Sequence, residues 1–151
     1  MKKILSAIAA LMICAVMMVS CKSSGSGPYA AEVKTINESK DATELANAVS
    51  KIMLNYEKAN ADEIVAAFHA MSKIEDSKVD ASKLTMTEAD KEKFQMNMML
   101  CWERVKAQDP ELFKKEDEAF KKNPDNREGM SLDDYIKAGK SLQELMKMKT
   151  E

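Results

Sequence analysis

The chain has 151 residues, of which 32% are charged, and its formal net charge is −2. This length is sufficient for one domain that buries a core without help from metals or disulfides. The acidic balance excludes the strongly basic face that nucleic-acid-binding proteins present, so we expect no nucleic-acid partner.

Residues 1–20 have the pattern of a secretory signal peptide. Lys2 and Lys3 form a basic start, and residues 4–19 are apolar except for Ser6. This apolar run is shorter than the ~20 residues that a membrane-spanning helix needs, and no stop-transfer segment follows it. We therefore predict that residues 1–20 are removed from the mature chain.

The end of this leader resembles the lipobox of bacterial lipoproteins. It reads Met18, Val19, Ser20, Cys21, with a small residue before the cysteine and methionine where that family usually has leucine. The resemblance implies cleavage between Ser20 and Cys21 and acylation of Cys21 with chains such as palmitate. Several acyl chains anchor a protein durably, whereas one binds only marginally. The alternative is a secreted protein that is cut near Ser20 and keeps Cys21 as an ordinary cysteine.

Residues 22–28 form a Gly/Ser-rich spacer that can hold a domain away from the membrane. By analogy with the same family, Lys22 in place of aspartate favours the outer membrane, with the domain facing the periplasm. The spacer has no acidic cluster, which makes surface display the less favoured alternative. Residues 29–41 show only a weak helical pattern at Val33 and Ile36, so we assign residues 21–41 to the lipidated cysteine and a linker.

Residues 42–151 are predicted to form an all-α bundle of four or five amphipathic helices. Apolar residues recur at spacings of three and four, and no segment alternates as a strand would. We expect helices over residues 43–58, 62–75, 87–108, 110–123 and from residue 131 onward. Residues 72–86 contain a five-residue near-repeat and are predicted to be a connection held down by Ile74, Val79 and Leu84. Without the two leader lysines, 21 basic residues stand against 25 acidic ones, a net charge of −4 for the mature chain.

The helix over residues 87–108 is apolar on two faces. The first face contains Phe94, Met98, Cys101, Trp102 and Val105, and the second contains Met96, Met99 and Leu100. Such a helix is either central in its bundle or offers its second face to a partner. Because soluble domains rarely expose a patch of this kind, we expect other helices to cover both faces. The second face is the candidate binding surface.

The loop over residues 123–134 resembles an EF-hand calcium loop in its second half. Its candidate ligands are Asn123, Asp125 and Asp134. However, Arg127 occupies a ligand position and Glu128 replaces the glycine of the sharp turn. We therefore expect no calcium site, but a polar loop in which Ser131 and Asp134 cap the last helix.

Residues 96–101 offer a second metal hypothesis. Met96, Met98, Met99 and Cys101 carry soft sulfur ligands of the kind that bind Cu(I). Helical spacing places Met98 and Cys101 on one face and Met96 and Met99 on another, so the four cannot readily share one ion. We expect these residues to pack in the core and predict no cofactor.

The single histidine, His69, has no nucleophile or carboxylate close to it in the sequence that would indicate a proton relay. The chain also has no P-loop, dinucleotide-binding motif, nucleophile elbow or zinc-protease helix. The sequence thus favours a membrane-anchored, periplasm-facing lipoprotein with a non-catalytic binding or scaffolding domain. An envelope protein would be its partner. The alternatives are a metal-binding lipoprotein and an enzyme of unrecognised class.

Overall fold

The computed structural model describes residues 27–150, and within that range the secondary structure is α-helix and 3₁₀-helix. The α-helices are α2 (Ala30–Glu38), α3 (Ala42–Leu54), α4 (Ala61–Met71), α5 (Glu88–Gln108), α6 (Pro110–Lys122) and α7 (Leu132–Thr150). Two 3₁₀ turns, η1 (Asp76–Lys78) and η2 (Ala81–Lys83), lie between α4 and α5. The prediction of an all-α fold is confirmed.

The prediction that residues 29–41 are a linker is wrong, because α2 belongs to the folded domain. Val33 and Ile36 are 1% and 3% exposed and lie in the core, where α2 packs on α3 and α4. The backbone amide of Tyr29 donates a hydrogen bond of 2.8 Å to the buried carboxylate of Glu63. Two apolar side chains are too few for a clear sequence periodicity, and their burial depends on helices that follow later in the chain.

Gly27, predicted to lie in the spacer, is also in contact with the domain. A Cβ atom at this position would lie 2.1 Å from Oε1 of Glu63 and 2.4 Å from the side-chain nitrogen of Asn60. Glycine therefore lets the backbone approach the start of α4 without displacing these two side chains. The fold begins no later than Gly27, which leaves residues 22–26 between the candidate lipid site and the domain.

Polar side chains cap the N-termini of α3, α4, α5 and α6. Asp41 caps α3, Asn60 and Glu63 form a capping box at α4, and Thr87 and Asp90 form one at α5. Asp109 caps α6, which has Pro110 at its first position. These side chains accept hydrogen bonds from backbone amides that have no partner within the helix.

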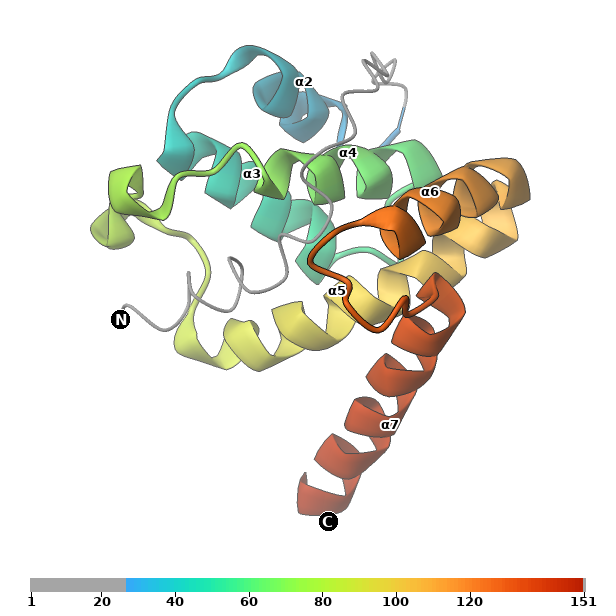
Figure 1. Ribbon diagram of the computed structural model, residues 1–151. Coiled ribbons are helices and arrows are strands. Elements are labelled where there is room, and N and C mark those ends of the chain that lie inside the picture. The colour runs from blue at the N-terminus through green and yellow to red at the C-terminus, as the bar shows by residue number, and fades with distance from the viewer. Residues whose placement is uncertain (1–26, 151) are drawn as a thin grey trace.

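α5 is the central helix of the bundle and contacts α3, α4, α6 and α7 (Figure 1). Its first face is buried, with Trp102 only 1% exposed and packed edge-on against Phe68 at a centroid distance of 4.8 Å. Asn97 donates a hydrogen bond of 3.0 Å to the carbonyl of Met53 and so joins α5 to the end of α3. The connection over residues 72–86 is held as predicted, with Ile74 buried and Val79 and Leu84 packed on the core.

α7 leaves the bundle after its first half (Figure 1). Leu132, Tyr135, Ile136 and Gly139 are its buried residues, and the later part of the helix extends away from the other helices to the far end of the molecule from α2. In the described range, no helix has the length and apolar character to cross a membrane.

Candidate functional site

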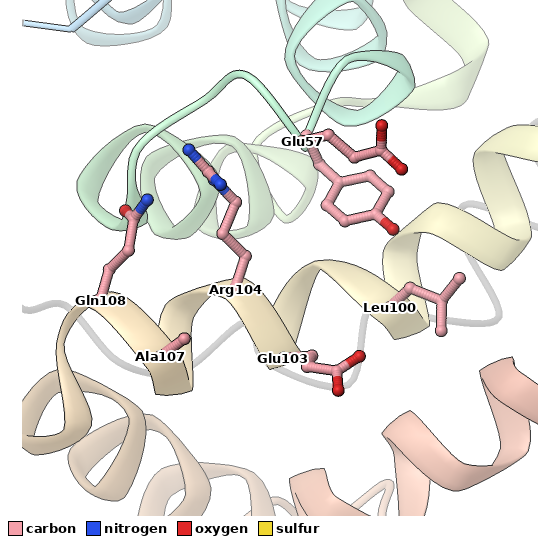
Figure 2. Close-up of a pocket in the computed structure, with 7 residues that line it drawn as sticks. Glu57, Leu100, Glu103, Arg104, Ala107 and Gln108 are labelled. Atoms are coloured by element: carbon pink, nitrogen blue, oxygen red, sulfur yellow. The ribbon is translucent and has the colours of Figure 1, made fainter.

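A pocket of about 250 Å³ lies between α5 and the connection that joins α3 to α4 (Figure 2). Tyr56 and Glu57 come from the connection, and the α5 residues that line the pocket are Leu100, Glu103, Arg104, Ala107 and Gln108. The pocket thus contains Leu100, one of the three residues of the candidate binding surface.

Two polar side chains of this pocket hold the connection in place. Nε of Arg104 donates a hydrogen bond to the carbonyl of Ala59, and Oε1 of Gln108 accepts one of 2.8 Å from the amide of Ala61. Figure 2 shows both side chains reaching from α5 toward the connection. Their role is structural, because they satisfy backbone groups that precede and begin α4.

The lining of the pocket combines charged side chains with apolar ones. Glu103 forms an ion pair of 2.7 Å with Lys140 of α7, and desolvation, followed by the charge of Glu57, raises the pKa of Tyr56. Leu100 and Ala107 supply the apolar surface. The arrangement can hold one apolar side chain or a small group, and it brings no nucleophile together with a base.

α7 covers part of the second face of α5. Leu100 is buried at 4% exposure, whereas Met96 and Met99 are half-buried. The contact depends on Gly139, because a Cβ there would lie 2.7 Å from Cβ of Met99 and 3.2 Å from Cδ2 of Leu100. The absence of a side chain at Gly139 is what allows this close approach. The expected coverage of the second face therefore holds at Leu100 and is incomplete at Met96 and Met99.

The outer half of α7 carries exposed apolar side chains. Leu145 is 55% exposed and Met148 is 71% exposed, and they are the large exposed hydrophobic residues of the described range. Leu142 and Met146, on the same helix, are half-buried. The apolar pattern of this helix thus continues past the point at which its own domain covers it.

The sulfur atoms of residues 96–101 are divided between two environments. Met98 and Cys101 are 0% exposed in the core, while Met96 and Met99 lie on the half-buried second face. The thiol of Cys101 donates a hydrogen bond of 3.2 Å to the carbonyl of Met98, and burial raises its pKa far above the ordinary value. The helix separates the four side chains as its spacing predicted.

Two of the candidate calcium ligands in the loop over residues 123–134, Asn123 and Asp134, accept hydrogen bonds from residues close to them in the same loop. Oδ1 of Asn123 accepts a hydrogen bond of 2.9 Å from the amide of Asp125. Asp134 accepts a hydrogen bond of 2.9 Å from the hydroxyl of Ser131. The hydrogen bonds from the hydroxyl and the amide of Ser131 lower the pKa of Asp134. Ser131 in turn accepts a bond of 3.1 Å from the amide of Asp134, so the predicted cap at the start of α7 is confirmed.

Asn126 closes this loop, a role that the sequence did not indicate. Its side-chain nitrogen donates to the carbonyls of Phe120 and Met130 at 3.0 and 2.8 Å, and its oxygen accepts from the amide of Met130 at 2.9 Å. Gly129 has φ of +62°, the left-handed conformation that glycine adopts without strain. Among residues 27–150, no group of three or more His, Cys, Asp or Glu side chains is placed to hold a metal ion.

His69 has a partner that is distant in the sequence. Nε2 of His69 lies 2.9 Å from Oε2 of Glu116, and the pair joins α4 to α6. The side chain of His69 is 20% exposed and that of Glu116 only 8%. Glu116 lies 47 residues further along the chain, so no local motif could have indicated the pair.

Ser20 and Cys21, the predicted cleavage and lipidation residues, lie outside the described range. Comparison of the chain with protein-family models, with curated proteins and with solved structures finds no significant match.

Proposed function

We propose that this chain is a bacterial envelope lipoprotein whose helical domain acts by binding or scaffolding rather than by catalysis. The observation that carries the proposal is the lipobox-like sequence at residues 18–21. Its last residue, Cys21, lies six residues before Gly27, and the domain begins no later than Gly27. Acylation of Cys21 would therefore hold the domain directly beside a membrane. By analogy with other lipoproteins, Lys22 favours the outer membrane with the domain facing the periplasm.

A binding role is supported by a contrast between polar side chains that have partners within the domain and apolar side chains that the domain does not fully cover. His69 and Glu116 engage each other between two helices, and Arg104 and Gln108 hold a backbone connection. In contrast, Met96 remains half-buried and the end of α7 exposes apolar side chains. Flexible methionine side chains suit adaptable recognition surfaces.

The anchor is tested by metabolic labelling with a fatty acid and by membrane fractionation. We expect the wild-type protein to incorporate the label and to sediment with membranes. Cys21→Ala should remove the label and release the protein, while Cys101→Ala, a substitution of the buried cysteine, should change neither. A Cys21→Ala protein that keeps both its label and its membrane association would contradict the proposal.

The binding role is tested by purifying the anchored protein from detergent-solubilised envelopes. We expect an envelope protein to co-purify in a defined ratio and to be lost with Met96→Glu, which places a charge on the second face of α5. Met86→Glu is the matched control, because Met86 is a half-buried methionine in the connection before α5. If both variants retain the same proteins as wild type, this face is not the binding surface.

A further inference from the structure

We propose that the outer half of α7 is a second membrane contact, which docks the domain side-on onto an anionic lipid surface. The inference rests on the proposed lipid anchor, because the anchor supplies the nearby bilayer. The anchor itself is the N-terminal lipid, whereas this contact is made by a helix at the other end of the chain.

The apolar and charged side chains of this helix segment lie on opposite sides. At 100° per residue, Leu142, Leu145, Met146 and Met148 fall within an arc of about 160°. Lys137, Lys140, Glu144 and Lys147 fall within a separate arc of about 80°. A helix with this division, rich in lysine and low in overall hydrophobicity, lies in the plane of a membrane interface rather than across it.

The domain leaves two of the four apolar side chains of this arc largely uncovered. Leu145 and Met148 are 55% and 71% exposed, and Figure 1 shows the segment projecting from the bundle. A helix of this length gains little stability in water without packing. A surface that buries the apolar arc would stabilise it.

The charge of the segment favours anionic lipid over a second copy of the chain. Residues 137–151, which comprise the outer half of α7, the turn before it and Glu151, contain four lysines and two glutamates, a net charge of +2, although the mature chain is acidic overall. Two such segments would repel each other in a dimer. Lys137 and Lys140 pair with Asp134 and Glu103, but no ion pair within the described range engages Lys147 or Lys149.

Lys149 is the one charged residue inside the apolar arc. A lysine at such a position can lay its methylene stem along the apolar surface while its ammonium group reaches the headgroups. Each basic residue close to an anionic bilayer contributes a roughly fivefold gain in affinity. Lys147 and Lys149 are thus positioned to strengthen the contact that Leu145 and Met148 make.

The tether keeps the segment within reach of the bilayer. Cys21 and Gly27 are six residues apart in the sequence, so their Cα atoms lie at most about 20 Å apart. A domain of this size has a radius of gyration of about 14 Å, so it cannot stand far from the membrane. Because α2 and the end of α7 lie at opposite ends of the molecule, the contact requires the domain to lie with its long direction along the membrane.

The test places an environment-sensitive fluorophore at Met148→Cys in the anchored protein. Acylated Cys21 has no free thiol and Cys101 is 0% exposed, so the label goes to the new cysteine. The protein is reconstituted into phosphatidylcholine vesicles and into vesicles that also contain phosphatidylglycerol. We expect a blue shift of the label, and quenching by lipid-borne quenchers, in the anionic vesicles only. Both signals should weaken in high salt because the attraction is screened.

Charge variants decide whether the lysines carry the contact. Lys147→Glu with Lys149→Glu should lower the equilibrium constant for lipid contact by at least roughly twentyfold. Lys114→Glu with Lys115→Glu makes the same charge change at exposed positions of α6 and should leave the signal intact. Leu145→Ser, also exposed, should reduce the blue shift without unfolding the domain.

Three results would overturn the inference: a label that stays in water in both vesicles, an equal response in neutral vesicles, or a response that depends on protein concentration without lipid. The third would indicate a second copy of the chain.

Vesicle flotation is measured first. A protein that does not float with neutral vesicles lacks the anchor, which contradicts the proposed function alone. In that case the label is placed at Met148→Cys in a chain whose Cys14 and Cys21 are replaced by serine, and its response to added anionic vesicles decides the inference by the same criteria.

Discussion

At the scale of single residues, the hydrogen bond between His69 and Glu116 joins two helices and could not be anticipated from the sequence. Because Glu116 is buried, His69→Ala leaves its carboxylate without this partner. We expect the free energy of unfolding, measured in urea at neutral pH, to fall by roughly 1–3 kcal/mol. Glu116→Gln keeps a group that can hydrogen-bond to His69 and should cost less. Equal stability of His69→Ala and wild type would show that the pair contributes nothing.

The number of free thiols in the chain depends on how its N-terminus is processed, and Cys101 is the one thiol that this processing does not change. It is 0% exposed, and burial raises its pKa, so a thiol reagent should not reach it in the native protein. In denaturant we expect one reactive thiol per chain, because in the proposed mature form Cys14 has left with the leader and Cys21 is acylated. Two thiols would indicate cleavage without acylation, and three an unprocessed chain.

The same thiol predicts a dependence of stability on alkaline pH. The unfolded thiol ionises above about pH 8.5, whereas the buried thiol keeps its proton. Its contribution to stability is therefore fully present below that pH and decreases as the pH rises. The free energy of unfolding should fall more steeply above pH 8.5 in wild type than in Cys101→Ala, by up to about 1.4 kcal/mol per pH unit. Parallel curves for the two proteins would show that the thiol ionises equally in both states.

At the scale of elements, the crossing of α5 and α7 depends on the absence of a side chain at Gly139. Alanine is the better helix former, yet Gly139→Ala would place its Cβ 2.7 Å from Cβ of Met99. We expect the helices to separate and the stability to fall by roughly 1–3 kcal/mol in a thermal or urea melt. Ser141→Ala, exposed on the same helix, is the control and should be neutral or slightly stabilising. A stabilised Gly139→Ala protein would show that the crossing can relax at no cost.

The helices show how far local patterns predict this fold. α3 to α7 follow from their spacing and caps, with ends that differ from the predicted ones by a few residues; Tyr56 and Ile74, for example, lie just past the ends of α3 and α4. α2 was missed because Val33 and Ile36 gain their burial from α3 and α4 rather than from a stripe of their own. The pattern of α7 predicted a helix correctly, but it could not show that the bundle ends at Gly139 and leaves Leu145 and Met148 uncovered.

At the scale of the whole molecule, anchoring and surface chemistry support each other. The domain begins no later than Gly27, so a lipid on Cys21 would hold it within about 20 Å of a bilayer. Contacts that are weak in solution become effective at such a distance, because the tether raises the local concentration of the partner surface. If the proposed tether is present, the half-buried methionines of α5 and the basic end of α7 can act as weak contact surfaces.

The central claim, that the mature chain begins at an acylated Cys21, is tested most directly by the intact mass and N-terminal peptide of the protein isolated from membranes. We predict that residues 1–20 are absent, and that the N-terminal peptide begins at Cys21 and carries the added mass of its acyl chains. An N-terminal peptide that begins at Met1, or one that begins near Cys21 with an unmodified thiol, would contradict it.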